Sequence, residues 1–309
     1  MALELLPVLS ALMLSVAPGT EPQVLRLPVA PAETLAVTLE GSGDPVVMVP
    51  GLLGSSYTFR HVRPAVAATG RAVLVIEPLG TGSSSRPEGA DYSLAAQSYR
   101  IEAVLDSLGV RSPILVCHAV GASICLRLAV RRPDLAAGIV SINGGAAEES
   151  GTPGLRSALR FAPVLKLFGA EGYVRGKIRD GLIESSADAS WVTDEVVRGY
   201  TAAFDGDLGG ALDTFRRMVG AEEPDSLRPR LSSIRAPVHL LVGGGTEEPP
   251  VPSAEVAVLL RELSDFRMEH VPGTGLYIQE ERPEAVVEAV LAMADLAPEV
   301  GRSGTPTRP

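Results

Sequence analysis

The chain has 309 residues, of which 46% are hydrophobic, and it carries a formal net charge of -10 at pH 7. One α/β domain with an additional helical segment fits this length and can bury a full hydrophobic core. The acidic balance, without a basic stripe, disfavours nucleic acid and anionic membranes as partners. Cys117 and Cys125 lie eight positions apart, and no Cys/His cluster has metal-ligand spacing, so no disulfide framework and no metal site are expected.

The first element along the chain is an apolar run from Leu5 to Ala17, followed by a polar, proline-rich stretch. This run is too short for a stable membrane span but fits the core of a signal peptide. No basic residue precedes Arg26, however, and Glu4 is present. Residues 1–20 are therefore interpreted either as a signal peptide of an exported protein or as an N-terminal helix of a cytoplasmic one.

Two short apolar runs, Val46–Val49 and Ala72–Ile76, are predicted to be buried strands, and glycine-rich turns follow both of them. Helical spacing is found near Pro64 to Ala68 and again from Ser93 to Leu108. Strands that alternate with helices in this way predict a parallel sheet covered on both faces.

A third apolar run, Pro113–Cys117, leads through a short turn into a helical pattern that begins at Val120. Strand, sharp turn and helix in this order indicate a nucleophile elbow, which normally presents a serine at its tip. Ala119 occupies the tip here, and a methyl group cannot attack a carbonyl carbon. Ser123 lies one turn into the helix and Cys117 ends a buried strand, so both are interpreted as packing residues.

About ninety residues without a clear strand pattern separate a strand at Gly138–Ile142 from a strand at Val238–Val242. A plain loop of this length is uncommon in a compact domain. Helical spacing recurs through it, and much of the chain's aromatic content lies there. The predicted helical segments are Leu155–Leu167, Tyr173–Leu182, Val192–Phe204 and Leu212–Met218.

From Pro45 to about Ala292 these landmarks, in this order, resemble the α/β-hydrolase family, especially its esterases, epoxide hydrolases and haloperoxidase-like members. The resemblance implies the α/β-hydrolase fold, with a mostly parallel central sheet flanked by helices and a helical cap inserted over the pocket. The divisions expected are residues 1–20 as described above, a core at 21–149 and 236–297, a cap at 150–235, and a disordered tail at 298–309.

The family's catalytic positions can be carried over one by one. The histidine normally follows the last strand in a loop that reads Pro-Gly-x-Gly-His, and Leu276 stands at its place here. The acid normally follows the strand that ends at Val242, where Glu247 or Glu248 can fill it. Together with Ala119, this mapping leaves the triad without its nucleophile and its base.

The binding part of the site is retained under the same resemblance. The N–H groups of Leu52 and Val120 match the two usual oxyanion donors, which need no particular side chain. Leu53, His118 and Tyr277 are further pocket candidates.

The chain has four histidines that could replace the missing base. His118 in the elbow and His270 at the end of the last strand are the foremost candidates. His61 and His239 follow, and a structural role is the preferred interpretation for all four.

Three functions fit these observations. The first is a degenerate hydrolase that binds a small apolar carbonyl compound under the cap without ordinary ester hydrolysis. The second is a carboxylic-ester-type hydrolase whose Ser and His are substituted in this copy. The third is a lyase, isomerase or cyclase that uses the oxyanion site without a nucleophile. No cofactor is expected, the partner is a small apolar or ester-like molecule, and the oligomeric state does not follow from the sequence.

Overall fold

The computed structural model describes most of the chain. Among the described residues, no helix is long and apolar enough to cross a membrane. Several predictions concern residues outside the described ones: residues 1–20 except Val16, the tail at 298–309, Leu53, Glu247 and Glu248. The first predicted helix of the insertion, the name used below for residues 150–235, also lies outside them. The described ranges are 16, 21–52, 54–151, 171–245 and 249–296.

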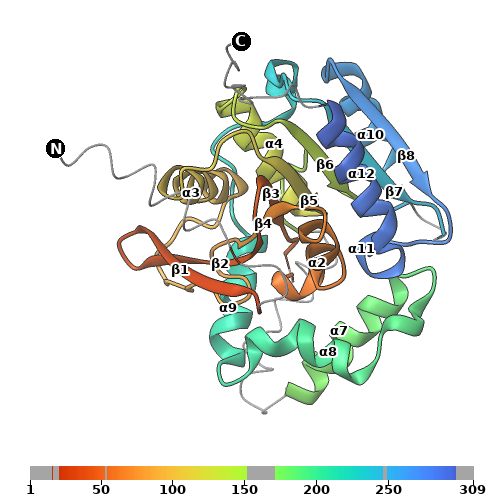
Figure 1. Cartoon of the computed structure of the whole chain (residues 1–309). Helices are drawn as coiled ribbons and strands as arrows, with labels where there is room; N and C mark the ends of the chain where they lie inside the picture. Colours follow the sequence, from red (N-terminus) through yellow and green to blue (C-terminus); the bar gives the residue numbers. More distant parts are fainter. Residues whose placement is uncertain (1–15, 17–20, 53, 152–170, 246–248, 297–309) are drawn as a thin grey trace, which may run out of the picture.

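An eight-stranded sheet with the order β1-β2-β4-β3-β5-β6-β7-β8 forms the centre of the molecule (Figure 1). β1 and β2 form an antiparallel hairpin at one edge, β2 pairs antiparallel with β4, and all other neighbours are parallel. This mostly parallel sheet confirms the predicted fold class. The strands are β1 (Gln23–Ala30), β2 (Glu33–Gly41), β3 (Asp44–Val49), β4 (Arg71–Glu77), β5 (Ile114–His118), β6 (Gly138–Ile142), β7 (Val238–Gly243) and β8 (Phe266–Val271).

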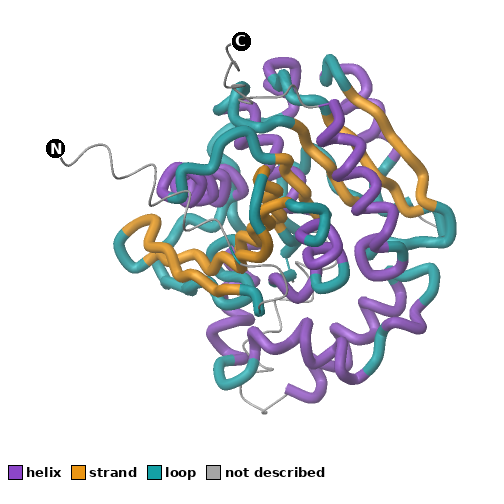
Figure 2. Tube along the Cα trace, in the orientation of Figure 1, coloured by secondary structure: helices purple, strands orange, loops and turns teal. Residues whose placement is uncertain are grey.

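Helices cover both faces of this sheet, as Figure 2 shows. Successive side chains of a strand point to opposite faces, so Val47 packs in one hydrophobic cluster, whereas Val46 and Met48 pack in the other. The sheet is therefore buried on both sides. The first cluster includes α3 (Leu94–Ser107), α4 (Val120–Arg131) and α10 (Ser253–Glu262), and the second includes α2 (Val62–Ala67) and α12 (Pro283–Leu296).

The predicted helical segments of the insertion that are described are indeed helical. α7 and α8 lie together at one end of the molecule (Figure 1). They pack through Leu182, Val196 and Tyr200 against Tyr57 and Tyr277 of the core. The helices of the insertion are α7 (Glu171–Glu184), η2 (Ala189–Trp191), α8 (Asp194–Thr201), η3 (Ala202–Phe204), α9 (Leu208–Val219) and η4 (Arg228–Ser233), and the core adds η1 (Ser56–Phe59) and α11 (Ile278–Glu281).

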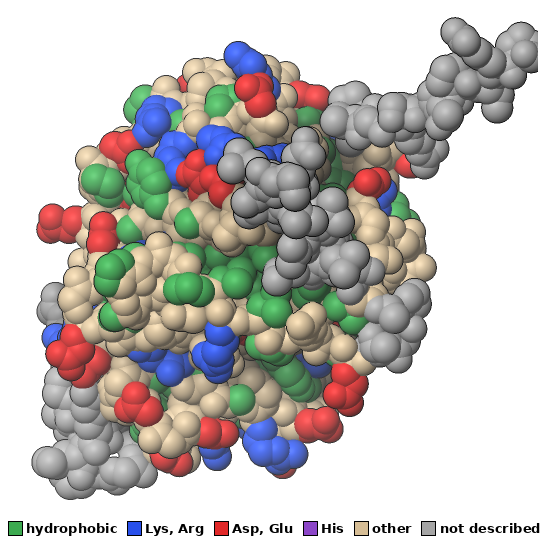
Figure 3. Space-filling view, turned by 60° about the vertical axis from the view of Figure 1, so that its left-hand side comes forward, with side chains coloured by type: hydrophobic (Ala, Val, Ile, Leu, Met, Phe, Trp, Pro, Cys, Tyr) green, Lys and Arg blue, Asp and Glu red, His purple; other side chains and the backbone are tan. Residues whose placement is uncertain are grey.

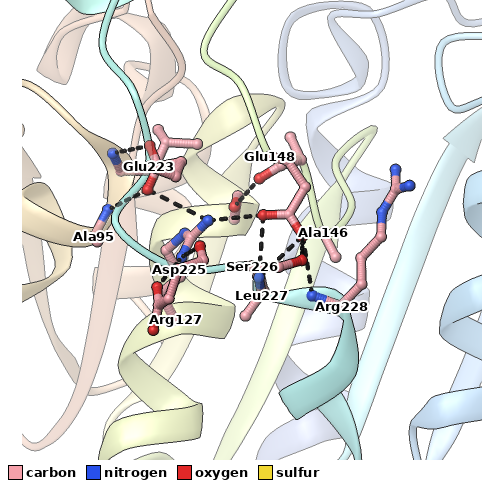
Figure 4. A network of polar contacts seen from close by, with 12 residues as sticks. Ala95, Arg127, Ala146, Glu148, Glu223, Asp225, Ser226, Leu227 and Arg228 are labelled. Atoms are coloured by element: carbon pink, nitrogen blue, oxygen red, sulfur yellow. Dashed lines mark hydrogen bonds and ion pairs between the residues drawn. The ribbon is translucent and has the colours of Figure 1, made fainter.

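A polar network around Arg127 of α4 attaches the segment that follows α9 to the core (Figure 4). The Arg127 side chain is only 4% exposed and forms ion pairs with Glu148 (3.0 Å), Glu223 (3.3 Å) and Asp225 (3.0 Å). Glu223 also accepts hydrogen bonds from the N–H groups that begin α3, including that of Ala95 (3.0 Å). One buried guanidinium thus joins α4, the loop after β6 and the end of the insertion.

Cys117 and Cys125 form a disulfide, with their Cα atoms 6.7 Å apart. The expectation that these cysteines would not form one was therefore wrong. The turn at Ala119 folds α4 back onto the sheet, which brings a residue at the end of β5 next to one in the second turn of α4. Sequence spacing alone does not reveal this proximity.

The charges of the chain are mixed on the face that Figure 3 shows. Lys and Arg side chains lie beside Asp and Glu side chains, and hydrophobic side chains gather between them. No basic stripe is visible on this face.

Candidate active site

The backbone at Ala119 has φ 49° and ψ -123°, an unusual conformation for a residue with a side chain. Ala119 lies between the end of β5 and the start of α4, and its N–H donates to the carbonyl oxygen of Ile142 at 2.9 Å. A Cβ atom on Gly121 would lie 2.7 Å from the Val49 carbonyl oxygen. Glycine at this position therefore allows α4 to begin directly against β3, and Ala119 stands at the tip of a sharp strand-to-helix turn.

The loop that follows β3 approaches this turn closely. A Cβ atom on Gly51 would lie 3.3 Å from His118 Nδ1 and 3.4 Å from the Ala119 Cβ. The N–H groups of Leu52 and Val120 have no hydrogen-bond acceptor among the described residues. Both residues are half-buried. Two unpaired donors thus border the space in front of the turn.

A small pocket is lined by both of these residues. Three of its polar side chains are already hydrogen-bonded to backbone: Thr81 donates to Pro78, Tyr92 donates to Pro87, and Gln97 binds both polar groups of Leu79. The N–H groups of Leu52 and Val120 remain unpaired within the described part of the chain. The pocket volume of about 10 Å³ is enough for one water molecule or one oxygen atom of a small molecule. The lining consists of Pro50, Gly51, Leu52, Pro78, Thr81, Tyr92, Leu94, Gln97, Val120, Ile124, Ser150 and Met218.

Leu276 lies next to the turn, where its carbonyl oxygen accepts hydrogen bonds from His118 Nε2 (3.1 Å) and Asn143 Nδ2 (3.0 Å). The structure therefore brings the segments of Ala119 and Leu276 together. The family's acid position cannot be placed in the same way, because Glu247 and Glu248 lie outside the described residues.

Asn143 was not singled out by the sequence, although it organises this region. Its Nδ2 also donates to the Gly275 carbonyl oxygen (2.9 Å), and its Oδ1 accepts from the Gly243 N–H (2.9 Å). It has φ 49°, a conformation that asparagine tolerates better than most residues. An asparagine directly after a buried strand was the available signal. Its side chain joins the ends of β6 and β7 to the loop after β8.

His118 is buried, and burial lowers the pKa of its imidazole to about 4. Nε2 faces a carbonyl oxygen, so this atom carries the proton, and Nδ1 has no partner. The ring is thus neutral near pH 7. Its Nε2 is already committed to Leu276, and the ring does not line the small pocket.

The three remaining histidines and Ser123 do not line the small pocket. His239 is buried and contacts Arg267 (2.9 Å) and Glu269 (3.2 Å), as a structural histidine does. The His61 side chain is 51% exposed. His270 is exposed on β8 at the edge of the sheet. Ser123 is fully buried and donates to the Ala147 carbonyl oxygen at 2.6 Å.

Tyr277 packs in an aromatic cluster beneath the insertion. Its ring centroid lies 5.5 Å from that of His118, 5.4 Å from that of Trp191 and 6.0 Å from that of Tyr200. Burial and the nearby Glu280 carboxylate raise the pKa of the Tyr277 phenol to about 12. The phenol is therefore neutral near pH 7. Tyr277 joins the insertion to the elbow, and it does not line the small pocket.

We expect His118 to make the free energy of unfolding pH-dependent. Its pKa is about 4 in the folded protein against an ordinary value of 6.5, so between these pH values the unfolded chain binds more protons. The free energy of unfolding contributed by His118 therefore rises with pH across this window, by at most about 3 kcal/mol. Urea denaturation from pH 4 to 7, compared with His118→Gln, isolates this contribution. Equal pH slopes in the two proteins would contradict it.

Comparisons with known proteins agree with the fold described above. A family model described as the alpha/beta hydrolase fold matches residues 44–188. A cis-3-alkyl-4-alkyloxetan-2-one decarboxylase of Shewanella oneidensis is 38% identical over 110 residues, which cover 35% of this chain and 34% of that protein. An uncharacterized hydrolase of Bacillus subtilis is 25% identical over 79% of this chain and 88% of its own length.

Solved structures show the same likeness at lower sequence identity. A meta-cleavage product hydrolase from Pseudomonas fluorescens, solved as a serine-to-alanine mutant complexed with acetates, superposes with a TM-score of 0.71. The two chains are 19% identical, and the match covers 89% of this chain and 98% of that one. At this identity the likeness concerns the fold alone.

Proposed function

The chain belongs to the α/β-hydrolase fold family, and from this premise we propose that it binds a small, mostly apolar carbonyl or carboxylate compound without ordinary ester hydrolysis. The observation that carries the proposal is Ala119 at the tip of the strained turn. Covalent catalysis there needs a nucleophile and a base that activates it, and Ala119 and Leu276 provide neither.

Alternative groups do not supply the missing chemistry among the described residues. Ser123 is hydrogen-bonded away from the turn. The free nitrogen of His118, Nδ1, is a weak base because burial lowers the pKa of the ring to about 4, and His118 does not line the small pocket. An enzyme without its triad keeps a residual acceleration on the order of 10³-fold over water through its oxyanion donors and substrate binding. Binding is thus the stronger remaining capacity of this site.

The ligand class follows from the donors and from the pocket lining. The Val120 N–H lies at the start of a 12-residue helix, where the helix dipole favours a negative charge or a polar oxygen. Beside it lie the apolar side chains of Leu94, Ile124 and Met218. The pocket volume of about 10 Å³ suits the oxygen of a carboxylate or carbonyl group, so an attached short alkyl chain would extend out of the pocket past these apolar side chains. Acetate is a practical first probe, because the solved serine-to-alanine hydrolase was complexed with acetates.

We expect the protein to show negligible turnover of p-nitrophenyl acetate and no covalent labelling by fluorophosphonates. It should nevertheless bind acetate, and more tightly butyrate, in an NMR titration. Val120→Pro removes one N–H at the first helical position, where proline is tolerated, and should weaken carboxylate binding about tenfold, as expected for the loss of one hydrogen bond to a charged group.

The matched control is Val120→Ala, which retains the N–H and should bind carboxylates like the original protein. Circular dichroism checks that both variants are folded. Stoichiometric labelling of any serine would refute the proposal, since it would reveal an activated nucleophile. Carboxylate binding that is equally strong in the proline variant would place the ligand elsewhere.

One observation favours a second candidate function, that of a hydrolase whose Ser and His are substituted in this copy. Ala119 retains the backbone conformation of a nucleophile elbow, which costs on the order of 1 to 3 kcal/mol. An alanine side chain has no catalytic use for this conformation. A scaffold shaped for a nucleophile explains this strain.

A further inference from the structure

β8 is the last strand of the sheet, and no described residue pairs with its outer edge. Arg267, Met268, Glu269 and His270 are all exposed, so the middle of the strand is open to solvent on both faces as well as along the edge. An exposed edge of this kind presents unpaired N–H and C=O groups that can pair with another strand.

The backbone direction identifies which residues carry these free groups. The Val238 N–H donates to the Asp265 carbonyl oxygen (2.9 Å), and the Gly244 N–H donates to that of Val271 (3.3 Å). Odd-numbered residues of β8 thus face β7. Because the direction alternates along a strand, Phe266, Met268 and His270 direct their N–H and C=O groups outward.

We propose that the chain forms a two-fold symmetric dimer in which β8 pairs antiparallel with β8 of a second copy. When the two-fold axis passes Met268, each Met268 opposes the other, and Phe266 opposes His270 of the second copy. All outward groups of these residues are then hydrogen-bonded in pairs. The two sheets become one continuous sheet.

The charges of the strand select this register. With the axis at Met268, Arg267 opposes Glu269 of the second copy, and the symmetry repeats this pair. A register centred on Arg267 places two arginines opposite each other, and one centred on Glu269 places two glutamates opposite each other. Opposite charges at directly facing positions stabilise an antiparallel pair, whereas like charges destabilise it.

The side chains on both faces of β8 also favour a second copy of this chain as the partner. Arg267 and Glu269 both contact the buried His239, at 2.9 and 3.2 Å, which holds them on one face of the strand. On the other face, Met268 is 37% exposed, and Leu260 of the neighbouring α10 is 59% exposed. A second copy would cover apolar surface on one face and pair charges on the other.

Sedimentation velocity of the full chain tests the proposal, and we expect a dimer. Met268→Pro removes an outward N–H without touching the ladder to β7, and should yield a monomer. Arg267→Glu and Glu269→Arg each create two like-charge pairs, so each should raise the dimer dissociation constant about tenfold or more.

The charge-swapped double variant, Arg267→Glu with Glu269→Arg, should restore dimerisation to within about threefold, because it re-creates both opposite-charge pairs. Val24→Glu, on the strand at the opposite edge of the sheet, is the matched control and should leave the dimer intact. A monomeric original chain, as expected if the charges only protect the edge, overturns the proposal. A dimer that persists in Met268→Pro, with circular dichroism like that of the original chain, also overturns it.

Discussion

Ala119→Ser combined with Leu276→His is expected to produce measurable hydrolysis of p-nitrophenyl acetate, at least about 100-fold above either single variant. A serine at the tip would be exposed at the start of α4, beside the N–H groups of Leu52 and Val120. A histidine at position 276 would come from the segment whose carbonyl oxygen contacts His118. Nucleophile and base act as a unit, so their effects should be strongly non-additive.

Two further variants sharpen this restoration experiment. Glu247→Gln and Glu248→Gln are each introduced into the double variant. The substitution that lowers the regained hydrolysis rate identifies the acid. Ala119→Ser with Leu276→Gln is the matched control, because it adds a polar side chain without a base, and it should remain inactive. A folded double variant that hydrolyses no ester would indicate a site remodelled for binding, and would argue against a recently silenced hydrolase.

Arg127→Met is expected to lower the free energy of unfolding by about 3 to 5 kcal/mol, the usual effect of removing one partner of a buried ion pair. Glu223 would lose its guanidinium partner while its side chain remains 7% exposed, and Glu148 would lose an ion pair at 3.0 Å. Urea denaturation measures the effect.

Arg235→Met provides the exposed counterpart of this substitution. Arg235 pairs with Asp134 at 2.9 Å, but the two side chains are 73% and 84% exposed. Solvent screens such a pair, so the free energy of unfolding should change by less than about 1 kcal/mol. Equal effects of the two substitutions would show that the Arg127 network contributes no more than a surface ion pair.

Much of the sheet could be predicted, because its parallel strands are short continuous apolar runs. Val46–Val49 and Gly138–Ile142 both form strands at or within a few residues of the expected bounds. The antiparallel hairpin of β1 and β2 was not predicted. Its turn contains Ala32 with φ 62°, where glycine or asparagine would be the usual signal. The Ser85 hydroxyl, more than fifty residues away along the chain, donates to the Ala32 carbonyl oxygen (3.3 Å) and accepts from the Thr34 N–H (2.8 Å), so a long-range contact holds this turn.

In the candidate site, too, features formed by neighbouring residues could be predicted, whereas contacts between distant segments could not. The elbow at Ala119 is a local pattern, so its position followed from neighbouring residues. Asn143 binds Gly275, which lies more than a hundred residues further along the chain. Tyr277 packs on Trp191, which lies nearly ninety residues before it. Such contacts depend on how the elements pack, and a single sequence carries no direct signal for them.

The disulfide between Cys117 and Cys125 spans the turn at Ala119 and is almost inaccessible, with exposures of 0% and 1%. Thiol–disulfide exchange requires an attacking thiolate to reach one of the sulfur atoms. Exchange at this bond must therefore wait until α4 separates from β5. The rate at which a reducing solution cleaves this disulfide is therefore limited by how often β5 and α4 separate through local unfolding.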